Sequence, residues 1–86
     1  MYPYVVEFLG TLLLVGALAF TGNPLYFLAS LSMAIGLGGK ISGGHFNPAV
    51  STWAWLAGKL PTNTFGLYLG AQLAAAALVW ILHTVM

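Results

Sequence analysis

The sequence predicts an all-α membrane protein with three membrane-spanning helices and one shorter helix that enters the membrane without crossing it. Three observations support this prediction. The 86-residue chain is 60% hydrophobic and only 3% charged. Its apolar residues fall into three long runs separated by turn signals. A fourth, much shorter apolar run follows the polar stretch of residues 42–48.

The composition excludes a soluble domain. The charged side chains are Glu7, Lys40 and Lys59. Surfaces in water carry roughly 25–35% charged residues, so a soluble fold of this chain would expose large apolar patches. We therefore expect an integral, multi-pass membrane protein, with residues 1–86 forming a single unit surrounded by lipid.

Several functional classes have no support in the sequence. The chain has no Cys and a net charge of +1, and it contains no paired carboxylates, no nucleophile beside a base and no phosphate-binding loop. We expect no enzyme activity, no metal site, no cofactor and no nucleic-acid partner.

The three long apolar runs are predicted to be helices over about residues 4–20, 25–37 and 65–85. The first ends at the turn signal Thr21-Gly22-Asn23-Pro24, and the second is expected to end at Gly38-Gly39-Lys40. About 20 residues cross roughly 30 Å of hydrocarbon. The second run therefore needs its flanking residues to span.

The fourth run, predicted to be a helix over residues 48–57, is too short to span. At ~1.5 Å per residue, its nine residues 49–57 reach about 14 Å, near half of the apolar thickness. Asn47 is a favoured N-cap residue and Pro48 suits the first helical position. The helix either ends midway through the membrane or lies on its surface with Trp53 and Trp55 at the headgroups.

The loop before this helix, residues 38–47, favours the first alternative. Gly43 and Gly44 allow irregular backbone, which is tolerated at membrane depth only when it is buried in protein or lines a wet cavity. Carbonyl groups from Gly43 to Phe46 could then face a file of water. The positive end of the half-helix dipole and the Asn47 amide would repel cations but not neutral solutes.

The stretch Ser42-Gly-Gly-His-Phe-Asn-Pro-Ala-Val50 resembles the first Asn-Pro-Ala box of the aquaporin and aquaglyceroporin (major intrinsic protein) family. Residues 7–11 and 68–72 resemble the openings of that family's first and third helices. The resemblance implies one aquaporin-like repeat and a passive channel for water, glycerol or other small neutral solutes. The predicted pore-lining residues are Gly43, Gly44, His45, Phe46, Asn47, Pro48 and Ala49.

The resemblance implies a family pattern of two such repeats in tandem, inverted across the membrane, whereas this chain has one. The family also implies an arginine three positions after the Asn of the second box, where this single box has Val50. Either two inverted copies build one pore, or the chain is a fragment or structural subunit completed by a different half-channel. The family's tetramer would then imply four pores from eight chains.

Three spans place the two ends of the chain on opposite sides, so a second copy must insert upside down to bring two half-helices together. Lys40 and Lys59 both fall on the N-terminal side, which weakly favours an inside N-terminus. We expect dual topology. Gly66, Gly70 and Ala74 recur at a spacing that permits close helix approach, although small residues are also common in membrane helices without that role.

The remaining polar and aromatic residues suggest supporting roles. Glu7 is costly in lipid and, with Gln72, is predicted to brace the N–H groups of the loop; alternatively it extends to the nearby interface. His45 is expected to line the vestibule, as a pH gate or as a neutral hydrogen-bonding group. Tyr26 or Phe27 could narrow the far mouth, opposite Gly44 and Val50 of the inverted partner.

Overall fold

The computed structural model describes residues 2–86 and is entirely helical in its regular structure. The helices are α1 (Pro3–Thr21), α2 (Pro24–Ser42), α3 (Pro48–Leu56) and α4 (Thr62–Val85). By length and composition, α1, α2 and α4 could each cross a membrane, whereas α3 has only nine residues. The predicted class, three spans and one short helix, is confirmed.

The helix boundaries follow from proline, asparagine and glycine. The dipeptide Asn-Pro starts two helices: Asn23 Oδ1 accepts from Leu25 N at 2.8 Å, and Asn47 Oδ1 accepts from Ala49 N at 2.8 Å. Each side chain thus satisfies an N–H group that has no intrahelical partner. At the other end of α2, Gly43 adopts a left-handed φ of 90° and its N–H donates to Gly39 O at 2.7 Å.

Two helices are longer than the sequence predicted. Helix α2 continues through Gly38, Gly39 and Lys40 to Ser42. Gly38 lies in contact with α1, because a Cβ there would collide with a methyl group of Val6. A glycine in a helix costs about 1 kcal/mol relative to alanine, but here it permits the contact. Helix α4 begins at Thr62, directly after the extended Pro61.

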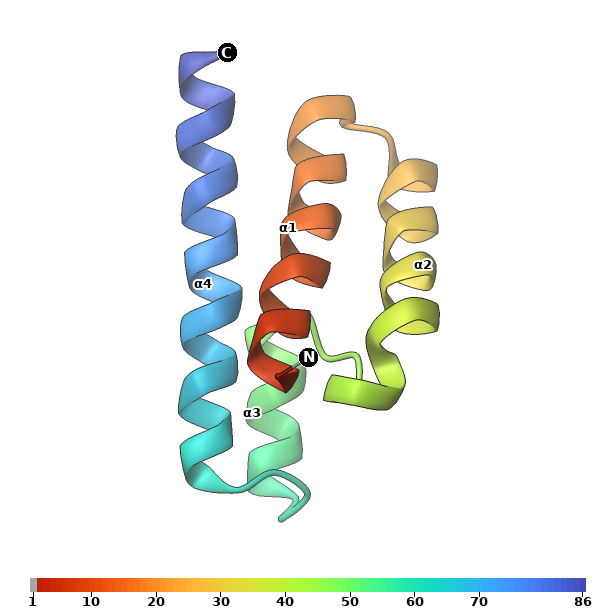
Figure 1. Cartoon of the computed structure of the whole chain (residues 1–86). Coiled ribbons are helices and arrows are strands. Elements are labelled where there is room, and N and C mark those ends of the chain that lie inside the picture. The colour runs from red at the N-terminus through yellow and green to blue at the C-terminus, as the bar shows by residue number, and fades with distance from the viewer. Residues whose placement is uncertain (1) are drawn as a thin grey trace.

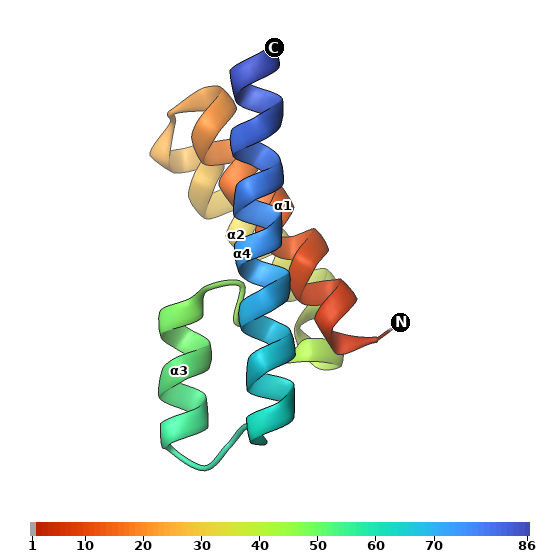
Figure 2. The same cartoon turned by 90° about the vertical axis from the view of Figure 1, so that its left-hand side faces the viewer.

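Helix α1 is the centre of the arrangement. It packs against both α2 and α4, and α3 packs against α4. Figure 1 shows α1 between α2 and α4, with α3 below it. Figure 2 shows that α3 runs alongside the first half of α4, with its N-terminal end beside the middle of that helix. A helix lying flat on a membrane surface would instead cross α4.

A cluster at the turn between α3 and α4 fixes this alignment. Trp55 stacks on Phe65 with ring centroids 4.7 Å apart, and its Nε1 donates to Thr62 Oγ1 at 3.0 Å. Lys59 Nζ lies 4.9 Å from the centroid of the Trp53 ring. These contacts place indole rings and a cation at one end of the molecule, where membrane proteins meet headgroups.

The interior is unusual in composition. The buried hydrophobic cluster consists of Val6, Leu14, Ala34 and Phe46, with Phe27 and Leu31 packed against it. The buried polar side chains are Glu7, Thr11, Ser30, Ser42, Ser51 and Gln72. Most large apolar residues are on the surface, as expected where the surroundings are lipid.

Candidate pore-forming site

The re-entrant loop between α2 and α3 is held by one carboxylate. Glu7 is fully buried, and its two oxygens accept four hydrogen bonds. Oε1 accepts from Phe46 N at 2.7 Å and from Gln72 Nε2 at 2.9 Å. Oε2 accepts from Ser42 Oγ at 2.6 Å and from His45 N at 3.1 Å. Glu7 therefore does not extend to an interface.

These hydrogen bonds satisfy backbone N–H groups that irregular structure would otherwise leave unpaired in an apolar environment. Between the two helices, N–H groups have no helical partner, and an unsatisfied buried one costs about 1–3 kcal/mol. Gly44 N donates to Ser42 Oγ at 3.2 Å, and the next two N–H groups donate to Glu7. Three consecutive donors of the loop are thereby satisfied from one side.

The carbonyl groups of the same loop are free. Within residues 2–86, no protein group donates to the carbonyl oxygens of residues 43–46. The loop therefore has one side on which its N–H groups are bound by protein and a set of acceptors left for other molecules. Gly43 and Gly44 both have positive φ, 90° and 68°, which suits residues without a side chain.

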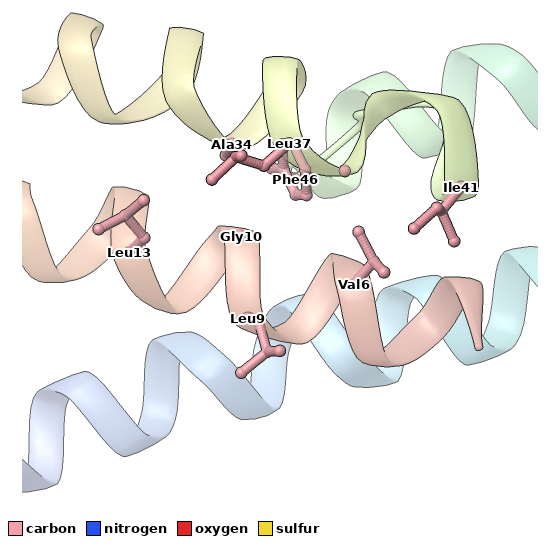
Figure 3. A pocket seen from close by; sticks show the side chains of 9 residues that line it. Val6, Leu9, Gly10, Leu13, Ala34, Leu37, Ile41 and Phe46 are labelled. Carbon is pink, nitrogen blue, oxygen red and sulfur yellow. The ribbon is translucent and has the colours of Figure 1, made fainter. Parts of the chain in front are cut away.

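Phe46 has a role that the sequence did not indicate. It is the one non-glycine residue with positive φ in the described chain, at 52°, and only 2% of its side chain is exposed. Its ring lies between α1 and α2, beside Gly10 (Figure 3). Because the ring is buried in the cluster with Val6, Leu14 and Ala34, any lining role of Phe46 rests with its carbonyl group.

Asn47 lies at the tip of α3, and the oxygen of its side-chain amide is already hydrogen-bonded. Its Oδ1 caps the helix through Ala49 N, and in the described chain nothing accepts from its Nδ2. The residue is exposed, as are Ala49 and Val50. The two amide hydrogens can therefore donate to a molecule beside the loop. The nearby helix N-terminus adds positive potential.

A second polar group lies behind the loop. His45 Nδ1 is 2.9 Å from Ser51 Oγ, which accepts from Gln72 Nε2 at 2.8 Å. The Tyr68 ring packs edge to face against the imidazole, with ring centroids 5.3 Å apart. The Tyr68 hydroxyl donates to Ser42 O at 2.6 Å. The sequence had named Glu7, Gln72 and His45 for this region but not Ser51 or Ser42.

Helical spacing indicates two of the residues behind the loop, Tyr68 and Ser51. Tyr68 and Gln72 are four apart on α4 and so share a face. Ser51 lies one turn beyond Asn47 on α3. A polar residue at such a position in an otherwise apolar helix indicates a polar partner nearby, because a lone hydroxyl in an apolar setting is costly.

Other predicted site residues lie elsewhere. Tyr26 and Phe27 are in the first turn of α2, at the opposite end of that helix from the loop; Tyr26 is exposed, and Phe27 packs against the hydrophobic cluster. On α4, Gly66, Gly70 and Ala74 are exposed, and a Cβ on either glycine would meet nothing within 4 Å. The repeat itself therefore does not use this small-residue face.

The possible metal-ligand side chains of the described residues are dispersed. Across residues 2–86, no three His, Cys, Asp or Glu side chains gather into a possible metal-binding group. A groove of about 270 Å³ lies between α1 and α2 and is lined by apolar residues, Phe46 among them (Figure 3).

Together, three span-length helices and a short helix whose tip is reached through a braced loop define an integral membrane protein with a re-entrant element. The profile of the family described as Major intrinsic protein matches residues 2–86. The chain is also 46% identical over 70 residues to Aquaporin Z of Brucella melitensis biotype 1 (strain ATCC 23456), a match that covers 76% of this chain and 30% of that protein. The chain belongs to the major intrinsic protein family, as the sequence motifs predicted.

The chain spans less than a third of the length of this curated relative. No solved structure gives a significant match.

Proposed function

We propose that this chain forms a passive membrane channel for water and for small neutral solutes such as glycerol, with the re-entrant loop and the tip of α3 as its pore-lining part. The observation that carries this proposal is the division of the loop. Glu7 binds the loop's N–H groups from behind, while the carbonyl groups of residues 43–46 and the Asn47 amide remain free.

This arrangement suits a molecule that both donates and accepts hydrogen bonds. Water passing the loop would donate to the carbonyl oxygens and accept from Asn47 Nδ2, exchanging one set of hydrogen bonds for another at little cost. A cation would face the positive end of α3 and the amide hydrogens. The proposed selectivity for neutral solutes follows from this electrostatic asymmetry.

The depth of the tip supports a position near the middle of the membrane. Gln72, which shares Glu7 with the loop, is ten residues into α4, about 15 Å along a helix of about 36 Å. If α4 crosses the membrane, as its length permits, one α3 lines only about half of the thickness. A second half-helix is needed for the rest.

We further propose that the second half-helix comes from an inverted copy of the same chain, and that four such pairs assemble into eight chains. The unused Gly66, Gly70 and Ala74 face of α4 would let the two copies approach closely. Lys40 and Lys59 provide only a weak bias in orientation. Dual insertion is therefore compatible with the charge distribution.

A specific observation supports one alternative: the chain matches only 30% of Aquaporin Z. The chain could instead be one part of a pore that a different half-channel completes. Both alternatives keep the site described above and differ only in the partner.

Two measurements on the purified chain test these proposals. In proteoliposomes, stopped-flow light scattering should show osmotic water permeability well above that of protein-free vesicles. Because the chain has no cysteine, Tyr2→Cys and Met86→Cys can be labelled from each face in turn. Labelling of both positions from both faces supports inverted pairs. A single orientation together with water permeability no higher than that of protein-free vesicles would favour a missing half-channel.

A further inference from the structure

Four polar side chains form a continuous chain of hydrogen bonds behind the loop. It runs from Glu7 on α1 through Gln72 on α4 and Ser51 on α3 to His45 in the loop, with successive distances of 2.9, 2.8 and 2.9 Å. The first three side chains are at most 1% exposed. Since bulk water does not reach them, their protons have few possible arrangements.

Glu7 fixes the first step. A carboxylate only accepts hydrogen bonds, so the side-chain amide of Gln72 must turn its nitrogen, not its oxygen, toward Glu7. The same nitrogen has a second hydrogen, and it points to Ser51 Oγ. The reversed amide would place its oxygen against Glu7 Oε1 and leave Ser51 without this donor.

Ser51 fixes the second step. Its oxygen receives the hydrogen from Gln72, so its own hydroxyl hydrogen needs an acceptor. Within residues 2–86, the remaining polar atom at hydrogen-bond distance is His45 Nδ1, and Ser51 is fully buried. A hydroxyl hydrogen buried without an acceptor is unfavourable. Nδ1 must therefore accept, and the hydrogen of a neutral imidazole lies on Nε2.

Nε2 lies beside Gly43, an exposed residue of the loop. The nearest atom to a Cβ built on Gly43 would be His45 Nε2, at 3.2 Å. In the described chain, the buried side-chain atoms without a partner are Thr11 Oγ1 and Gln72 Oε1. Nε2 has no protein partner and is not among them, so a small molecule can reach it. The edge-to-face contact with Tyr68 holds the ring in this orientation.

We propose that Ser51 is a positioning residue that locks His45 as the neutral tautomer with its hydrogen on Nε2, so that the imidazole presents a hydrogen-bond donor to the permeating solute. This inference rests on the proposed channel function and refines it. The loop then presents donors at His45 and Asn47 with carbonyl acceptors between them. Such a lining suits small neutral molecules with an acceptor oxygen.

Nuclear magnetic resonance of the full chain tests the tautomer without reference to transport. Protein labelled with ¹⁵N-histidine is studied in detergent micelles in mildly alkaline buffer, with His83→Gln used to assign the two imidazoles. We expect the ¹⁵N frequencies of His45 to show an unprotonated Nδ1 that accepts a hydrogen bond and a protonated Nε2. A proton on Nδ1, or on both nitrogens, would overturn the proposal.

Variants of α3 test the part played by Ser51. Ser51→Ala should shift the Nδ1 frequency of His45 toward that of an unbonded nitrogen and allow the two tautomers to exchange. Ser51→Thr retains the hydroxyl and should restore the wild-type frequencies. The matched control is Thr52→Val, because the Thr52 hydroxyl donates to Pro48 O and does not contact His45. A Ser51→Ala spectrum identical to that of the wild type would refute the role of Ser51.

Water permeability separates this inference from the channel proposal. Ser51→Ala should lower permeability per correctly folded chain by ~5-fold, the factor expected for one hydrogen bond of ordinary strength, and Ser51→Thr should restore it. If the wild-type chain shows the expected tautomer but no water transport, the channel proposal fails and the tautomer assignment stands. If permeability is high and the tautomer is wrong, the reverse holds.

Discussion

Replacing Gly10 by alanine should loosen the packing that holds the re-entrant loop. A Cβ on Gly10 would lie within 2.7 Å of three ring atoms of Phe46, well inside ordinary contact distance. The ring is buried against α2 and its backbone is constrained by the hydrogen bond to Glu7. A Cβ on Gly10 must therefore displace the Phe46 ring, which lines the groove between α1 and α2 (Figure 3), or move α1 away from the loop.

The size of this effect can be estimated from two opposing terms. Overpacking of a fixed core costs about 1–3 kcal/mol, whereas alanine is favoured over glycine within a helix by about 1 kcal/mol. Because the added Cβ would overlap three ring atoms, we take the upper end of the overpacking cost, about 3 kcal/mol. The net destabilisation is then about 2 kcal/mol, which corresponds to ~30-fold in the unfolding equilibrium. Displacement of Phe46 should also move Asn47, so water permeability should fall as well.

Gly16 provides the matched control on the same helix. A Cβ at Gly16 would meet nothing within 4 Å, so Gly16→Ala should be neutral or slightly stabilising. Unfolding of both variants in mixed micelles by increasing sodium dodecyl sulfate, followed by circular dichroism, compares their free energies of unfolding. Equal stability of the two variants, with equal water permeability, would refute the role assigned to the Gly10 and Phe46 contact.

Three further substitutions test the site. Glu7→Gln should destabilise the fold by at least about 1–3 kcal/mol, because an amide cannot accept all four hydrogen bonds; unchanged unfolding in the same assay would contradict this. Asn47→Asp keeps an oxygen to cap α3 but replaces the amide donors with a negative charge. The leak of potassium through proteoliposomes should therefore rise. A leak equal to that of the wild type, with unchanged water permeability, would argue against the role of Asn47. Tyr68→Phe leaves the buried Ser42 carbonyl without its donor and should cost about 1–3 kcal/mol, whereas Tyr26→Phe, at an exposed position, should stay within about 0.5 kcal/mol of wild type.

The sequence predicted the elements of this fold well because their signals are local. Asn-Pro at the start of two helices and the short length of the run after Asn47 are read directly from the chain. The end of α2 was wrong for a physical reason. The pair Gly38-Gly39 is typical of a helix end, but in the structure Gly38 lies within α2 in close contact with Val6. A glycine that ends a helix and one that permits packing look identical in sequence.

The candidate site was predictable by residue type and less so by geometry. Glu7 and Gln72 were named because a carboxylate and an amide in lipid need partners. The sequence does not show the contribution of Phe46, because its burial accompanies a left-handed φ, and the backbone conformation of a non-glycine residue is not visible in sequence. The position of Ser51 one helical turn beyond Asn47 indicates a polar partner, but it does not show which side chain that partner is.

The way this chain folds explains why its polar residues are concentrated inside. In lipid, burying a leucine between helices gains little, because the acyl chains it leaves are equally apolar. What distinguishes one arrangement from another is then the satisfaction of polar groups and the close fit of small residues with large ones. Glu7 and Gly10, three residues apart on α1, supply one of each: the carboxylate binds the loop's backbone, and the glycine admits the Phe46 ring. The same two contacts that fix the fold also fix the position of Asn47, so the stability of this repeat and the geometry of its proposed pore depend on the same residues.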